Sequence, residues 1–169
     1  MIRLHDISVP VFGRYLERLD ALVLIAAAHV ADRGLPEAAL LEARLAQDML
    51  PFEAQVRMAA GFPLRALRPL VPRLPELAFP KAASFANLRD DVAAALGALA
   101  MVEPADLEGR EAEIVTDRAG LADIALPAAC FVVDYALPNM LFHLSIAYAI
   151  ARWEGVKLGK ADFDGWHRY

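Results

Sequence analysis

The chain has 169 residues, 58% of them hydrophobic, and a formal net charge of -5 at pH 7. This length favours a single domain spanning 1–169, and the apolar fraction excludes a disordered chain. A net acidic chain does not attract phosphate backbones, so we expect no nucleic-acid partner.

Two further features indicate the compartment. The N-terminus lacks the apolar core of a signal peptide, and the most apolar run, Ala21 to Val30, is too short to cross a bilayer. The single cysteine, Cys130, leaves no intrachain disulfide, which fits a reducing compartment. We therefore expect a soluble cytoplasmic protein with no membrane partner.

The first segment predicts a long helix. Ser8 is a suitable N-cap, and Gly34 and Pro36 are suitable terminators. Between them, apolar residues recur at the three- and four-residue gaps of one helix face. These residues are Phe12, Leu16, Leu19, Val23, Ala26 and Val30. We expect roughly six helical turns here.

The next part of the chain predicts interrupted helix. A helical stretch opens at Pro36 and runs through Leu45, and Asp48 is a candidate N-cap for a further helix. Gly61 and Pro63 are expected to kink or break that helix, because proline cannot donate a main-chain hydrogen bond. The proline-rich stretch 63–80 is expected to be an irregular, exposed connection.

The second half predicts two more helices with a hairpin between them. Ser84 is the N-cap candidate of a helix that ends before Pro104. A turn ending at Gly120, between alternating segments, indicates a small β-hairpin at 110–126. The last helix is expected over 127–154 and should be largely buried, with an aromatic tail of Phe163, Trp166 and Tyr169 beyond it. Together these patterns predict an all-α, antiparallel four-helix bundle with a small hairpin before the last long helix.

Candidate chemistry centres on His143. It is the only one of the four histidines expected in mid-helix on a buried face, and Asn139, one turn earlier, is a poor ligand for a transition metal. A buried, hydrogen-bonded histidine is therefore a better interpretation than a metal ligand. Cys130 falls on a different face of the same helix, so we expect a buried, inert thiol there.

Three segments carry a resemblance to a known family. They are DYALPNMLFHLSIAYAIARWEGVKLGKADF (134–163), RLAQDMLPFEAQV (44–56) and SVPVFGRYLERL (8–19). With these residues the chain resembles an uncharacterised bacterial domain-of-unknown-function family of the DinB/YfiT-like superfamily. The resemblance implies an antiparallel four-helix bundle and a homodimer.

Many members of that superfamily hold a divalent metal through three histidines, one from the second helix and two from the fourth. His143 resembles the last histidine of the fourth-helix pair, and Asn139 stands where its partner would be. The second-helix stretch, 47–58, contains no histidine. The resemblance thus implies the fold but not an intact metal triad.

Three functional hypotheses remain. The favoured one is a helical-bundle protein without a metal cofactor that acts as a small-ligand-binding or interaction module. Its candidate pocket is formed by His143, Asn139, Asp48 and Gln55. The alternative is a divalent-metal-dependent transferase or hydrolase of DinB type that uses His143. In the third hypothesis the dimer surface itself is the function, with the aromatic tail as part of it.

Overall fold

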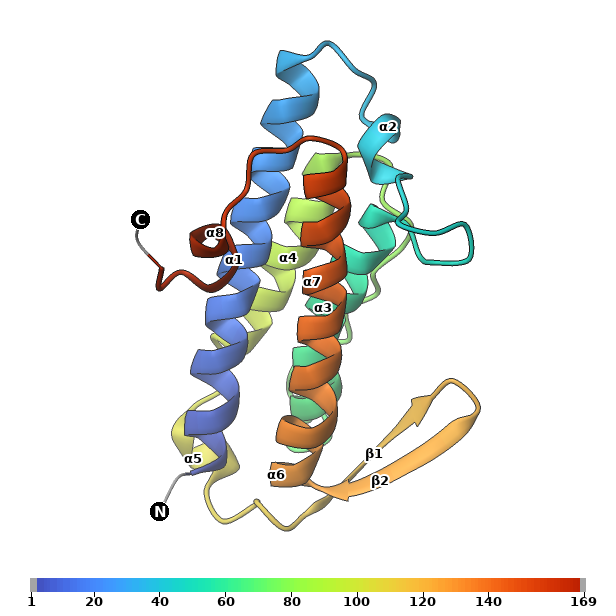
Figure 1. Cartoon of the computed structure of the whole chain (residues 1–169). Helices are drawn as coiled ribbons and strands as arrows, with labels where there is room; N and C mark the ends of the chain where they lie inside the picture. Colours follow the sequence, from blue (N-terminus) through green and yellow to red (C-terminus); the bar gives the residue numbers. More distant parts are fainter. Residues whose placement is uncertain (1–2, 168–169) are drawn as a thin grey trace.

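The apolar stripes fold into long helices that pack side by side, in a computed structural model that describes residues 3–167. The chain is mostly helical, with one two-stranded antiparallel sheet (Figure 1). In chain order the elements are α1 (Leu4–Asp32), α2 (Ala38–Leu41), α3 (Phe52–Leu67), α4 (Phe85–Leu99), α5 (Pro104–Leu107), β1 (Ile114–Ala119), β2 (Ala122–Pro127), α6 (Ala128–Cys130), the π-helix η1 (Phe131–Ala136), α7 (Leu137–Trp153) and α8 (Lys160–Asp164).

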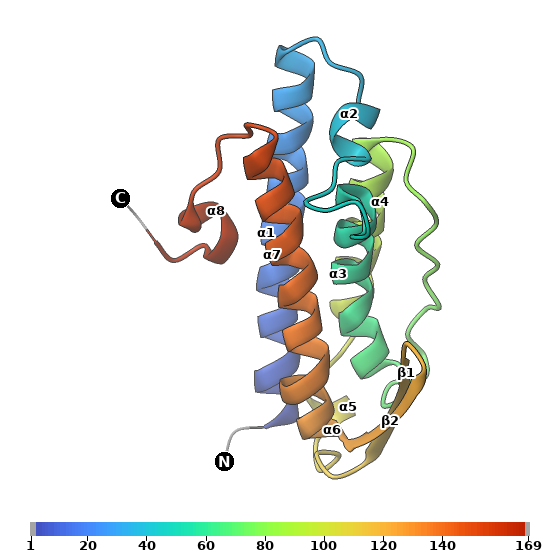
Figure 2. The ribbon, with the colours of Figure 1, turned by 45° about the vertical axis from the view of Figure 1, so that its right-hand side comes forward.

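The long helices α1, α3, α4 and α7 do not all alternate in direction. α1 packs on α4 and α3 packs on α7, and the helices of each pair run in opposite directions. α3 and α4 run in the same direction, because segment 68–84 returns the chain along the outside of α3 before α4 begins (Figure 2). The predicted helical class is confirmed. The predicted count of four helices is not, because residues 3–167 also form shorter helices between and after the four long ones.

α1 begins one turn earlier than the sequence suggests. Arg3 is its N-cap, and Ser8 lies inside the helix, where its buried Oγ donates to the carbonyl oxygen of Leu4 at 2.7 Å. The predicted N-cap at Ser8 is therefore wrong, because the hydroxyl has a partner within the helix. Gly34 ends the helix as predicted, with a φ of 63° that glycine adopts without strain.

α3 is longer than the sequence suggests. Helix α2 covers only four residues, and Pro51 rather than Asp48 is the N-cap of α3. The predicted break at Gly61 and Pro63 is wrong, since α3 continues through both residues to Leu67. Pro63 is buried with its neighbours, and this packing outweighs the local helix-breaking tendency.

Segment 68–84 is irregular but not simply exposed. Leu70, Val71 and Leu74 are buried, which corrects the prediction of a solvent-facing connection. Two hydrogen bonds to one ion pair on α3 hold the rest of the segment in place, as described below. This connection is therefore part of the packed structure.

The ion pair of Glu53 and Arg57 fastens the connection to α3. The Arg57 Nε and Nη2 atoms donate to the two carboxylate oxygens of Glu53, at 2.6 and 3.2 Å. Arg57 Nη1 also donates to the Phe79 carbonyl oxygen at 2.7 Å, and the Ala82 N–H donates to Glu53 at 3.3 Å. The Glu53 side chain is only 3% exposed, so its charge depends on these partners.

The remaining boundary signals agree well with the structure. Ser84 caps α4, its Oγ accepting the N–H of Asn87 at 3.1 Å, and Gly120 turns the antiparallel hairpin with a φ of 61°. Gly155 ends α7 with a φ of 88°. The tail folds back on the body, where Phe163 contacts the rings of Tyr15 and Tyr148. Tyr169, the last residue of the predicted aromatic tail, lies outside the described residues.

The final helical region departs from expectation in burial. Cys130 is exposed, so the predicted buried thiol is wrong. The stretch Ala128–Trp153 is by length and composition the one helix of residues 3–167 that could cross a membrane. Its most apolar 18 residues have a mean hydropathy of 1.3, and a third of them is buried. It packs along α3 within the protein.

Replacing Glu53 with glutamine tests the role of the ion pair. We expect E53Q to lower the free energy of unfolding by about 3 kcal/mol, because it removes one partner of a buried charge pair. Urea denaturation followed by circular dichroism measures the change. E42Q is the matched control, since Glu42 forms an exposed pair with Lys81 and should change stability very little. Equal effects of the two substitutions would contradict the assigned role.

Candidate functional site

The structure joins two of the candidate residues across α3 and α7. Gln55 is buried and His143 is half-buried, and the Gln55 Oε1 atom lies 2.7 Å from His143 Nδ1. The Gln55 Nε2 group donates to the Leu50 carbonyl oxygen at 3.2 Å, so Oε1 is the atom that faces the imidazole. Since an amide oxygen only accepts, Nδ1 carries the proton, and Nε2 is the unprotonated nitrogen of the neutral ring.

Aromatic neighbours hold the imidazole in a fixed orientation. The Phe62 ring stacks on His143 at 5.7 Å between centroids and an interplanar angle of 19°. Phe142 meets it edge-on at 5.3 Å. Burial lowers the pKa of His143, and the nearby positive charge of Arg65 lowers that pKa further. The ring is therefore neutral at pH 7.

A second polar group connects the hairpin to this region. The Tyr135 hydroxyl donates to Asp117 Oδ2 at 3.2 Å, and Arg65 Nη1 donates to the same oxygen at 3.4 Å. The Arg65 guanidinium also lies 5.0 Å from the centre of the Phe62 ring. Burial and the Asp117 charge raise the pKa of Tyr135, so its hydroxyl stays a proton donor.

Tyr135 reaches Asp117 from the π-helical turn η1. A π turn adds one residue to a helix and is found frequently at functional sites. The sequence carried one signal for it, Pro138, which has no N–H for a regular helical bond. The roles of Phe62, Arg65 and Asp117 had no local signal, because each depends on the meeting of distant segments.

The other two candidate residues lie apart from the imidazole. Asn139 donates from Nδ2 to the Tyr135 carbonyl oxygen at 2.7 Å, so its amide bonds within its own helix. Asp48 is exposed in the loop between α2 and α3. The structure thus brings together His143 and Gln55 only.

A histidine-ligated metal does not fit this donor set. His143 offers one imidazole nitrogen, and the facing oxygen of Gln55 already accepts the Nδ1 proton. Across residues 3–167, no three His, Cys, Asp or Glu side chains gather in a way that could hold a metal ion. Zinc and similar ions need three or four nitrogen, sulfur or carboxylate ligands, and one imidazole with an engaged amide falls short.

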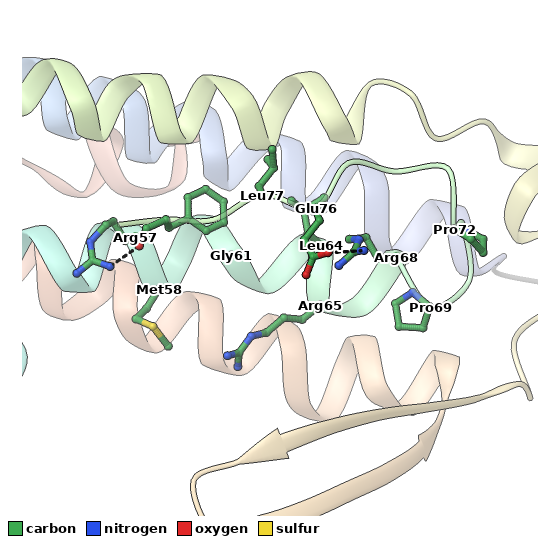
Figure 3. Close-up of a pocket in the computed structure, with 11 residues that line it drawn as sticks. Arg57, Met58, Gly61, Leu64, Arg65, Arg68, Pro69, Pro72, Glu76 and Leu77 are labelled. Carbon is green, nitrogen blue, oxygen red and sulfur yellow. Dashed lines mark hydrogen bonds and ion pairs between the residues drawn. The ribbon is translucent and has the colours of Figure 1, made fainter. Parts of the chain in front are cut away.

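A groove of about 550 Å³ lies between α3 and the connection that follows it. α3 forms its floor and segment 68–80 forms one wall (Figure 3). Apolar side chains and three arginines both line it. The lining residues are Arg57, Met58, Gly61, Leu64, Arg65, Arg68, Pro69, Pro72, Glu76, Leu77 and Phe79.

The groove and the imidazole occupy neighbouring faces of one helix. Gln55 and Phe62, seven residues apart, share the face toward His143. Gly61, Leu64 and Arg68 share the face toward the groove. At about 100° per residue, Arg65 falls between these faces. Arg65 therefore contributes both to the groove and to the electrostatic surroundings of His143.

Comparisons with known proteins agree with this fold. A family model described as a domain of unknown function (DUF1993) matches residues 4–164. The crystal structure of a DinB family member from Shewanella denitrificans is similar, with a TM-score of 0.84 and 28% sequence identity. The alignment covers 98% of this chain and 94% of that one. No curated protein matches the sequence. The resemblance to an uncharacterised DinB-like family is thereby confirmed.

The pH dependence of stability tests the description of His143. Its pKa is lower in the folded chain than the ordinary 6.5, so the unfolded chain binds the proton more readily. The free energy of unfolding should therefore fall as pH drops below about 6.5 toward the folded pKa. We expect H143F, which keeps a stacked ring, to cost about 1–2 kcal/mol at pH 8 by leaving Gln55 unpaired.

At pH 5 the cost of H143F should be smaller, because only the wild-type chain carries the penalty of protonation. Urea denaturation at the two pH values measures both differences. N139A is the control, since the Asn139 amide bonds only within its own helix and does not titrate. The stability difference between wild type and N139A should therefore be the same at both pH values. A gap between wild type and H143F that stays constant with pH would contradict the assignment.

Proposed function

The chain belongs to the DUF1993 family of domains of unknown function, and we propose that it is a single-domain, small-molecule-binding bundle of the DinB type that works without a metal ion. The observation that carries this proposal is the groove along α3. Its volume of about 550 Å³ is typical of pockets that hold a small ligand. Its lining combines apolar walls with a few polar groups, as such pockets do.

The side chains around His143 support a function that needs no metal ion. The neutral His143 imidazole, held by Gln55 and stacked on Phe62, is suited to a hydrogen bond rather than to a coordination sphere. The alternative, a metal-dependent transferase or hydrolase that uses His143, would need further ligands that residues 3–167 do not gather near it.

Four further properties belong to the same proposal. We expect a cytoplasmic homodimer without nucleic-acid or membrane partners. Phe142 and Trp153, which are 56% and 78% exposed on α7, support a subunit contact there, because exposed aromatic side chains are enriched at interfaces. The net charge of -5 supports the absence of nucleic acid.

Methionine methyl groups offer a direct test of ligand binding. Met58 lines the groove, whereas Met101 lies at the end of α4 outside its lining. In a fragment screen with methyl-labelled methionine, we expect ligands that shift the Met58 resonance and leave Met101 unchanged. The shifts should be equal with added Zn²⁺ and with a chelator, because no metal takes part.

The variant G61L supplies the control. A Cβ at Gly61 would lie 3.6 Å from the Phe79 ring, so a leucine there fills the groove while remaining compatible with a helix. G61L should abolish the Met58 shifts. A screen with no Met58 response, or a response that requires Zn²⁺, would overturn the proposal.

A further inference from the structure

The groove concentrates positive charge on an acidic protein. Three guanidinium groups line it, those of Arg57, Arg65 and Arg68, and the only carboxylate among the lining residues is that of Glu76. Arg57 and Arg65 also pair with Glu53 and Asp117, which lie outside the lining. The whole chain carries a net charge of -5, so this local excess runs against the overall balance. A cleft lined by one sign of charge attracts ligands of the opposite sign.

Two of the three arginines are available to a ligand. The Arg57 guanidinium is already hydrogen-bonded to Glu53 and to the Phe79 carbonyl oxygen. Arg65 and Arg68 each have one long contact to a carboxylate, 3.4 Å to Asp117 and 3.7 Å to Glu76. Contacts of this kind near the surface are weak and exchange readily.

Arg68 also carries an unsatisfied donor. Its Nε atom is buried, and no hydrogen-bond acceptor among residues 3–167 meets it. A simple role for arginine near the end of α3, complementing the negative pole of the helix, would explain its charge but not this unpaired group. The Arg68 side chain as a whole is 39% exposed, so a carboxylate can accept from the open part of its guanidinium, whereas the buried Nε is reached only if the side chain turns.

The apolar residues of the lining determine which ligand body fits beside the arginines. Met58, Leu64, Leu77 and Phe79 present apolar surface beside the two arginines. The absence of a side chain at Gly61 leaves the Phe79 ring close to α3, since a Cβ built there would lie 3.6 Å from the ring, and Phe79 also lines the groove. An apolar, planar body therefore fits this part of the groove.

The surroundings favour one negative charge over several. Glu76 stands at the groove with a side chain that is 82% exposed, and the C-terminal end of α3 contributes a partial negative charge. Both repel a doubly charged phosphate more strongly than a carboxylate. No helix N-terminus is among the lining residues to offset that repulsion.

We propose that the groove binds a monocarboxylate with an apolar body, its carboxylate on Arg65 and Arg68 and its body against Phe79. This assignment rests on the proposed ligand-binding function and names the class of ligand. Cinnamate, phenylacetate and octanoate are suitable probes, each with its uncharged amide as the matched compound.

Titration calorimetry and the Met58 resonance measure binding to the wild-type chain. We expect at least one of the three carboxylates to bind about tenfold more tightly than its amide, because only the anion forms charge-assisted bonds. R68Q should weaken that carboxylate about tenfold and leave the amide unchanged. R68K should recover part of the affinity, since it keeps the charge but loses the planar fork.

R44Q is the matched control, because Arg44 is an exposed arginine outside the groove whose loss changes the net charge equally. It should leave binding unchanged at moderate salt. Unfolding curves of R68Q and R44Q establish that both remain folded.

The possible outcomes separate the two proposals. Equal binding of carboxylate and amide at Met58, abolished by G61L, would overturn the ligand class while supporting a small-molecule site. Displacement of cinnamate by an equal concentration of inorganic phosphate would likewise overturn the preference for one charge. Failure of all six compounds and of the fragment screen to shift Met58 would overturn both.

Discussion

The groove, and the path of the chain around it, depend on the buried pair of Glu53 and Arg57. Arg57 donates a hydrogen bond to the Phe79 carbonyl oxygen, and Glu53 accepts one from the Ala82 N–H. These two bonds hold the backbone of the connection against α3. With the connection held there, the chain returns to the opposite end of the molecule, and α4 starts parallel to α3. A charge pair that costs free energy to bury is stabilised here because all three guanidinium nitrogens and both carboxylate oxygens have a hydrogen-bond partner.

The main elements could be predicted from the sequence, because apolar spacing and end signals are local. The stripe of the first helix, the cap at Ser84 and the glycine turns all agree with the structure. The errors at Ser8 and Pro63 have one cause. Both residues have strong local preferences, and in both cases burial inside a packed helix outweighs the preference.

The candidate site could be predicted only in part. Helical spacing predicts a mid-helix His143 on an inward face, and in the structure this residue meets Gln55 of α3. The groove could not be found in this way, because its floor is a helix and its wall is an irregular segment with no periodic pattern. Arg65 and Arg68 belong to no motif in the sequence, and only the fold brings them into one groove with Leu77 and Phe79.

Segment 68–84 contains residues that are buried in the interior and others that line the groove, and this separation bears on how such proteins diverge. The residues that anchor it, Leu70, Leu74 and Ala82, point into the interior, whereas Leu77 and Phe79 between them face the groove. Substitutions at these two positions would change the lining of the groove, where both side chains also pack against the core. Under the proposed ligand-binding function, relatives would share one architecture and differ in their ligands through a few residues of a single connection.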